Sequence, residues 1–286
     1  MNRLGGQKTQ AQPRKTFFHS NPVMNRLNKV EYISTDEKSV AYGRIALKTA
    51  WFLLITLCGM LLYLLLSNTV FSTDAQVMNF NYKGFEASVP MTALIAVGGS
   101  AVLAIITQLL AAFIPRTIPV TGTLYSLCQG FMISFIIFSL IKGYEYLGLL
   151  ALGITIVVVL TMALLYTKGI IKVNKKFITI MLTLLFSMIG ISLLTGIGYL
   201  IPLTRPFVAS IIGNFGISIG MTLISIIIAC MFLISDFAVI ESCVENRMPA
   251  KYEWMASFGL AFTILWIYIK VLDLIITIVG NSSKNS

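Results

Sequence analysis

Charge is scarce in this chain. Only 11% of its 286 residues are charged, whereas a soluble domain carries roughly 25%. So few charges cannot cover a water-facing surface, which excludes a soluble enzyme and a disordered chain. Cysteine is also scarce: there are four, three of them inside apolar runs and none in a CxxC spacing. That pattern excludes a secreted disulfide scaffold.

Catalytic signatures are missing as well. The sequence has no HExxH pair, no GxSxG elbow and no Walker phosphate loop. The single histidine, His19, lies in the polar N-terminal stretch, so a histidine triad is excluded. We therefore predict that the protein is not an enzyme and carries neither a cofactor nor a metal site.

Long apolar runs dominate what is present. Hydrophobic residues make up 57% of the chain, and the mean hydropathy is +0.88. A helix of about 20 such residues crosses about 30 Å of hydrocarbon. Seven runs meet this length, at about 45–66, 90–114, 120–141, 147–166, 177–201, 207–235 and 254–279. The sequence thus predicts an all-α integral membrane protein with seven transmembrane helices in a lipid bilayer.

In a membrane protein, the net charge of +10 indicates the orientation in the membrane and does not indicate a nucleic-acid partner. Sixteen of the 21 lysines and arginines fall before the first span or in the loops on that side, and four fall on the other side. Basic loops stay in the cytoplasm. We therefore predict a cytoplasmic N-terminus, an outside C-terminus and a location in the bacterial plasma membrane. The predicted parts are a disordered basic tail (1–38), a seven-helix domain (39–280) and a short extracellular tail (281–286).

Ionisable residues inside spans each require an explanation, because charge in hydrocarbon costs about 2.5–3.5 kcal/mol on insertion scales. Asp236 is expected at the end of the sixth span, either half-desolvated or as an ordinary interfacial acid in water. Lys270 and Asp273 are three residues apart and share one face of the seventh helix. They form either a local pair with Lys270 reaching outward or a pair that lines a polar path in the bundle.

Small residues suggest one place of close helix packing. Gly216 and Gly220 are four apart in the sixth predicted span, with Gly213 just before them. Such spacing allows helix backbones to approach each other in membranes. We expect a packing role for these three glycines.

The last third of the chain carries a family resemblance. The sixth span ends in Asp236-Phe237-x-x-Ile240-Glu241, and Pro249-Ala250-Lys251-Tyr252-Glu253-Trp254 follows. These segments, with Ser20-Asn21-Pro22 near the N-terminus, resemble the transmembrane Bax-inhibitor-motif family in its bacterial Bax-inhibitor-like branch. The resemblance implies six helices around a central seventh. It also implies a proton-sensitive calcium leak gated by two aspartates on the last two helices.

Only one of those two aspartates has a match here. Asp236 corresponds to the acid of the sixth helix, and the position of the second falls on Thr263 or on Lys270. Thr263 is preferred because its depth is closer to that of Asp236. Asp273 is the nearest acid on the seventh helix, but about 15 Å deeper. A second gating hypothesis is a cytoplasmic latch involving Glu241, Arg247 and Lys251, in which Asp236 pairs with Arg247, Lys251 or Lys48.

The sequence supports one main functional interpretation and two alternatives. The first is a pH-sensitive calcium or cation leak channel. The second is a non-transporting membrane regulator that binds other membrane proteins, such as a quality-control protease. A small secondary transporter fits the composition but lacks paired broken helices at matching places.

Overall fold

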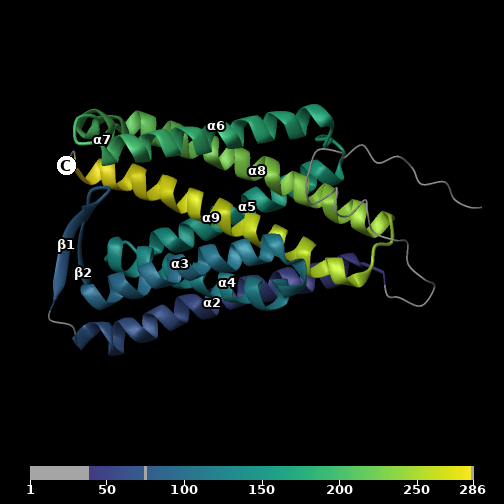
Figure 1. Cartoon of the computed structure of the whole chain (residues 1–286), viewed down its shortest axis with the longest axis horizontal. Coiled ribbons are helices and arrows are strands. Elements are labelled where there is room, and N and C mark those ends of the chain that lie inside the picture. The colour runs from purple at the N-terminus through teal and green to yellow at the C-terminus, as the bar shows by residue number, and fades with distance from the viewer. Residues whose placement is uncertain (1–38, 74–75, 285–286) are drawn as a thin grey trace, which may run out of the picture.

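Helices make up most of the molecule. A computed structural model describes residues 39–73 and 76–284 (Figure 1). Within these ranges, seven helices are long and apolar enough to cross a membrane. They are α2 (Tyr42–Thr69), α3 (Met91–Phe113), α4 (Ile118–Phe135), α5 (Tyr146–Thr167), α6 (Lys175–Leu200), α8 (Phe215–Glu245) and α9 (Glu253–Lys284). The protein is therefore an all-α, multi-pass membrane protein, as predicted. The predicted tail (1–38) lies outside the described residues.

Short elements join the long helices. They are the turns η1 (Phe71–Thr73), η2 (Pro115–Thr117) and η4 (Ala250–Tyr252), the π-helical turn η3 (Ile136–Leu140) and the helix α7 (Arg205–Gly213). A proline lies at or next to the start of η2, α7 and η4, because proline lacks the backbone N–H that a helix interior needs. Residues 281–284, predicted as part of a tail, belong instead to α9.

The sixth predicted span is corrected at both of its ends. Asn214 separates α7 from α8, and its side chain accepts a hydrogen bond from the Ile217 N–H at 3.2 Å. An asparagine in this position caps a helix start, so the span begins at Phe215 rather than at residue 207. It continues to Glu245, ten residues beyond the predicted end, so Asp236 lies inside the helix.

A β-hairpin between α2 and α3 was not predicted. Its strands, β1 (Val77–Tyr82) and β2 (Phe85–Pro90), pair antiparallel with Tyr82 opposite Phe85. The two turn residues, Lys83 and Gly84, both have positive φ, at 53° and 100°. This is the backbone of a type I′ turn, whose twist matches that of the flanking strands.

The hairpin marks one end of the helix bundle (Figure 1). We call it the hairpin end; the C-terminal part of α9 lies there. The opposite end holds the connection between α8 and α9, and the lysine-rich connection between α5 and α6 (168–174) follows α5 there. We call it the basic end. Between the two ends, α9 passes through the middle of the bundle and packs against α2, α4, α5 and α8, as expected of a central seventh helix.

Close helix packing involves other glycines than the predicted ones. A Cβ added at Gly59 of α2 would collide with the Leu127 carbonyl of α4, and one at Gly130 of α4 would collide with the Thr56 carbonyl of α2. Added Cβ atoms at Gly213 and Gly220 would meet nothing within 4 Å, and one at Gly216 would meet only the side chain of Asn214. The packing role predicted for those three is therefore wrong within the described chain, because Asn214 breaks the helix there and no neighbouring backbone approaches.

Candidate functional site

The central polar contact joins α8 to α9 through Asp236. The Thr263 hydroxyl donates a hydrogen bond to Asp236 Oδ2 at 2.6 Å, and Thr263 itself is only 3% exposed. Thr263, rather than Lys270, therefore lies opposite Asp236, because Lys270 is seven residues further along α9, about 10 Å along its axis. The pair places one ionisable group, not two, between these helices at this level.

A second carboxylate lies in the same interface nearer the hairpin end. Asp273 of α9 accepts a hydrogen bond at Oδ2 from the Thr222 hydroxyl of α8, at 3.1 Å. At Oδ1 it binds the Lys83 ammonium group. The pairing of Asp273 with Lys270 was therefore wrong, because the hairpin brings a different lysine to this acid.

The two contacts mirror each other. Asp236 belongs to α8 and is held by a threonine of α9, whereas Asp273 belongs to α9 and is held by a threonine of α8. Ten residues separate Thr263 from Asp273 on α9, so the two levels are about 15 Å apart. The α8–α9 interface thus carries two carboxylates, each satisfied by a hydroxyl from the facing helix.

The tip of the hairpin is fixed to α9 around Asp273. The Lys83 Nζ also donates to the Thr277 hydroxyl at 2.8 Å, and a Cβ at Gly280 would collide with the Lys83 carbonyl. Burial, together with the nearby Asp273 carboxylate, raises the pKa of Tyr82 to about 12. Its phenol therefore stays neutral at physiological pH and adds no second negative charge beside Asp273.

A third polar cluster lies at the basic end and centres on Glu253. Its carboxylate accepts from Arg44 Nε and from Lys48 Nζ, both at 2.6 Å, and from the Ala41 N–H at 3.2 Å. The Glu253 side chain is 1% exposed. The Lys48 ammonium also lies 4.8 Å from the centre of the Trp254 ring. This cluster ties the start of α2 to the start of α9.

The latch pairing of Asp236 was wrong within the described residues. Asp236 forms no ion pair there with Arg247, Lys251 or Lys48. Two of these lie beyond the end of α8, while the third is bound to Glu253.

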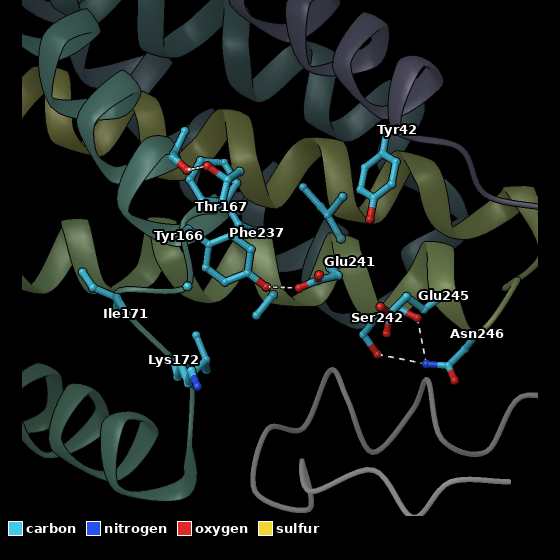
Figure 2. Close-up of a pocket in the computed structure, with 15 residues that line it drawn as sticks. Tyr42, Tyr166, Thr167, Ile171, Lys172, Phe237, Glu241, Ser242, Glu245 and Asn246 are labelled. Carbon is cyan, nitrogen blue, oxygen red and sulfur yellow. Dashed lines mark hydrogen bonds between the residues drawn. The ribbon is translucent and has the colours of Figure 1, made fainter.

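Glu241, the remaining latch candidate, lines a pocket at the basic end (Figure 2). The pocket has a volume of about 840 Å³ and is formed by α5, α8, the α5–α6 connection and Tyr42 of α2. The Tyr166 hydroxyl points at Glu241 and donates a hydrogen bond to it, as Figure 2 shows. Glu245, Asn246 and Lys172 line the same pocket, so its polar lining contains both acidic and basic groups.

Sequence reasoning identified Asp236, Thr263 and Asp273 but not their full surroundings. It missed Lys83 as the partner of Asp273, and it missed Glu253 as a buried acid that binds Arg44 and Lys48. A local signal existed for the hairpin, although not for the partner of Lys83: Lys83-Gly84 stands between two short segments with strand-like alternation, a pattern typical of a two-residue hairpin. No local signal marks Glu253, because its partners lie more than 200 residues away along the chain.

These features define a seven-helix membrane protein that holds ionisable side chains between two of its spans. A model of the family described as Bax inhibitor 1 like matches residues 21–280. The chain therefore belongs to the Bax inhibitor 1 like family, as the motifs of its last two spans suggest. No curated protein and no solved structure matches the chain.

Proposed function

We propose that the protein is a pH-sensitive leak channel for calcium and related cations, with its path along the α8–α9 interface. One observation carries the proposal: Asp236 and Asp273 lie at two levels of this interface, each held by a threonine of the facing helix. Ionisable groups inside membrane spans typically mark ion pathways. Calcium is bound through oxygen ligands, among which carboxylates are common.

The proposed pH response acts through Asp236. When ionised, this carboxylate accepts a charge-assisted hydrogen bond from the Thr263 hydroxyl, which is stronger than a bond between neutral groups. Protonation weakens the bond and so loosens the contact between α8 and α9. Calcium flux is therefore proposed to rise as the pH falls. One carboxylate suffices for this response, because Thr263 supplies the partner in place of a second acid.

The proposed setting is a bacterial plasma membrane with the basic end in the cytoplasm. The support is the distribution of lysine and arginine, most of which lie before α2 or in the connections at the basic end. Calcium would then enter the leak from the hairpin end.

Calcium efflux from proteoliposomes tests the leak. Purified protein is reconstituted into calcium-loaded vesicles, and efflux is followed at pH about 6 and about 8, a range that brackets neutrality. We expect efflux above that of empty vesicles, and faster efflux at the lower pH. The control is Glu245→Gln, which removes an exposed acid at the end of α8. Its efflux should equal that of the wild type. Efflux equal to that of empty vesicles at both pH values would contradict the leak.

The alternative is a non-transporting regulator that binds another membrane protein. It is supported by the pocket at the basic end, whose lining includes the acids Glu241 and Glu245 together with Lys172 (Figure 2). In that case a partner should be cross-linked to the wild type in membranes, and Glu241→Gln with Glu245→Gln should reduce the yield. The same double substitution should leave calcium efflux unchanged if the leak is the function.

A further inference from the structure

Lys83 places a positive charge among oxygen atoms that are arranged as cation ligands. We propose that Asp273, Thr222 and Thr277 form a cation-binding site at the hairpin end, and that the Lys83 ammonium group occupies it as a tethered plug. This inference rests on the proposed leak and adds an outer closure to it. It assigns a role to the hairpin.

Two oxygen atoms of the site contact the ammonium group, and the Thr222 hydroxyl binds the carboxylate that provides one of them. Lys83 Nζ donates to Asp273 Oδ1 and, at 2.8 Å, to the Thr277 hydroxyl oxygen. That hydroxyl gives its own proton to the Asp273 backbone carbonyl at 2.7 Å, so its lone pairs remain available for a cation. Thr222 donates to the other carboxylate oxygen at 3.1 Å and fixes its direction. The site is thus built from two helices and filled from a third element.

The turn itself is an unfavourable place for lysine. Type I′ turns favour Asn-Gly or Asp-Gly, because both central residues need positive φ. Lys83 adopts φ of 53°, a conformation that side chains with a Cβ seldom adopt. Backbone strain of this kind is retained where the side chain has a use. Here the use is to carry an ammonium group from the hairpin to the α8–α9 interface.

The hairpin is also fitted to α9 in a way that holds the plug in place. Gly280 lies against the Lys83 carbonyl, where an added Cβ would collide. The ring of Phe85 also packs edge-on against Tyr144, with 5.0 Å between ring centres. The side chains of Lys83 and Asp273 nevertheless remain 27% and 26% exposed. An ion pair with that access to solvent is weak and readily exchanged, as a reversible plug requires.

The chemistry of the site indicates the class of ligand. One carboxylate and two hydroxyl groups offer only oxygen atoms, which suit hard metal cations rather than soft ones. Calcium takes six to eight oxygen ligands, so water would complete its shell in this partly exposed position. The net charge of one carboxylate implies modest affinity, as expected for a site through which an ion passes.

The variant Lys83→Asn tests the plug without weakening the turn. Asn-Gly is the preferred type I′ pair, so the hairpin is retained while the tethered charge is lost. We expect calcium efflux from proteoliposomes to rise by up to about fivefold, the factor that corresponds to the strongest exposed ion pairs. Lys142→Asn is the matched control, because it removes the same charge from an exposed loop at the same end. It should leave efflux at the wild-type rate.

A second measurement reads the binding site without transport. In detergent, calcium chloride should raise the melting temperature of Lys83→Asn more than that of the wild type, whose site is filled by the ammonium group. The double variant Lys83→Asn with Asp273→Asn should lose this extra shift. Potassium chloride at equal ionic strength separates binding of calcium from a general effect of salt.

The outcomes separate this inference from the leak itself. If the wild type leaks, but Lys83→Asn neither leaks faster nor gains a calcium-dependent shift, the plug is wrong and the leak stands. If no variant leaks, but Lys83→Asn gains the shift and loses it with Asp273→Asn, the cation site is supported and the leak fails. If no variant leaks and Lys83→Asn gains no calcium-dependent shift, both the plug and the leak are overturned.

Discussion

At the scale of single residues, the α8–α9 interface uses hydroxyl groups to keep two carboxylates inside a membrane span. A carboxylate and a hydroxyl form one bond with one negative charge, whereas two carboxylates would repel each other unless they shared a proton. The pairing of Asp236 with Thr263 therefore needs no shared proton to be stable. Under the proposed gating, the response to pH depends instead on the strength of one charge-assisted hydrogen bond.

Thr263→Val removes that bond while keeping the shape of the side chain. We expect the free energy of unfolding to fall by about 1–2 kcal/mol, since a carboxylate loses its donor although hydrogen bonds within membranes are often modest. Unfolding in mixed micelles measures the change. Thr161→Val is the control, because that threonine is exposed and bonds only to its own helix. Equal stability of the two variants would contradict a role for the Asp236–Thr263 bond.

Glu253→Gln tests the cluster at the basic end. The buried carboxylate accepts from both Arg44 and Lys48, and a neutral amide cannot bind two cations as strongly. We expect a loss of about 1.5–3 kcal/mol in the free energy of unfolding. The substitution Glu86→Gln, at an exposed acid of β2, should have no measurable effect. If Glu253→Gln also left the free energy of unfolding unchanged, the cluster would not tie α2 to α9.

The residues of the site were predictable to different degrees. An acid inside an apolar run is visible in any sequence, and this is why Asp236 and Asp273 could be identified. Counting residues along one helix also placed Thr263 at the depth of Asp236. Partners from distant elements could not be identified, because no local pattern connects Lys83 to Asp273 or Arg44 to Glu253.

At the scale of elements, the hairpin and α9 act as one unit at the hairpin end. Their backbones meet at Gly280, where any larger residue would push the tip of the hairpin away. Similar contacts at Gly59 and Gly130 join two helices, α2 and α4, whereas the contact at Gly280 joins a helix to the hairpin.

Gly280→Ala should therefore release the hairpin. We expect faster hydrogen exchange of the amides in β1 and β2, because the displaced tip no longer holds the strands against α9. Gly153→Ala in α5 is the control, since a Cβ there meets nothing within 4 Å. Unchanged exchange in the hairpin of Gly280→Ala would contradict docking through this glycine.

The long helices were predictable because hydropathy over about 20 residues is a strong signal. The hairpin was missed because a search for helix-length runs treats six-residue strands as loop. The start of the sixth span was misplaced for a related reason: the apolar residues of α7 and α8 form one run, which only the cap at Asn214 divides. The turn pair Lys83-Gly84 marks the hairpin, and the cap residue Asn214 marks the start of α8.

At the scale of the whole molecule, charge is distributed unequally between the two ends. An odd number of spans places the N-terminal end of α2 and the C-terminal end of α9 on opposite sides of the membrane. The excess of lysine and arginine at the basic end predicts that this end faces the cytoplasm. The proposed plug at the hairpin end would then face the outside, where it controls entry.

Cysteine labelling of intact cells tests this orientation. In a cysteine-free background, a membrane-impermeant thiol reagent should label Lys142→Cys at the hairpin end without permeabilisation. It should label Lys168→Cys, in the connection after α5, only after the cells are permeabilised. The opposite pattern would reverse the orientation and place the plug in the cytoplasm.

The most direct test of the central claim compares calcium efflux at pH about 6 and about 8 for the wild type and for Asp236→Asn. Asparagine is permanently neutral, so it imitates the protonated acid and cannot strengthen its bond to Thr263 at higher pH. The account predicts that wild-type efflux is faster at pH about 6 than at pH about 8. It also predicts that Asp236→Asn shows, at both pH values, the rate that the wild type shows at pH about 6. A variant that keeps the pH dependence of the wild type would contradict gating through Asp236.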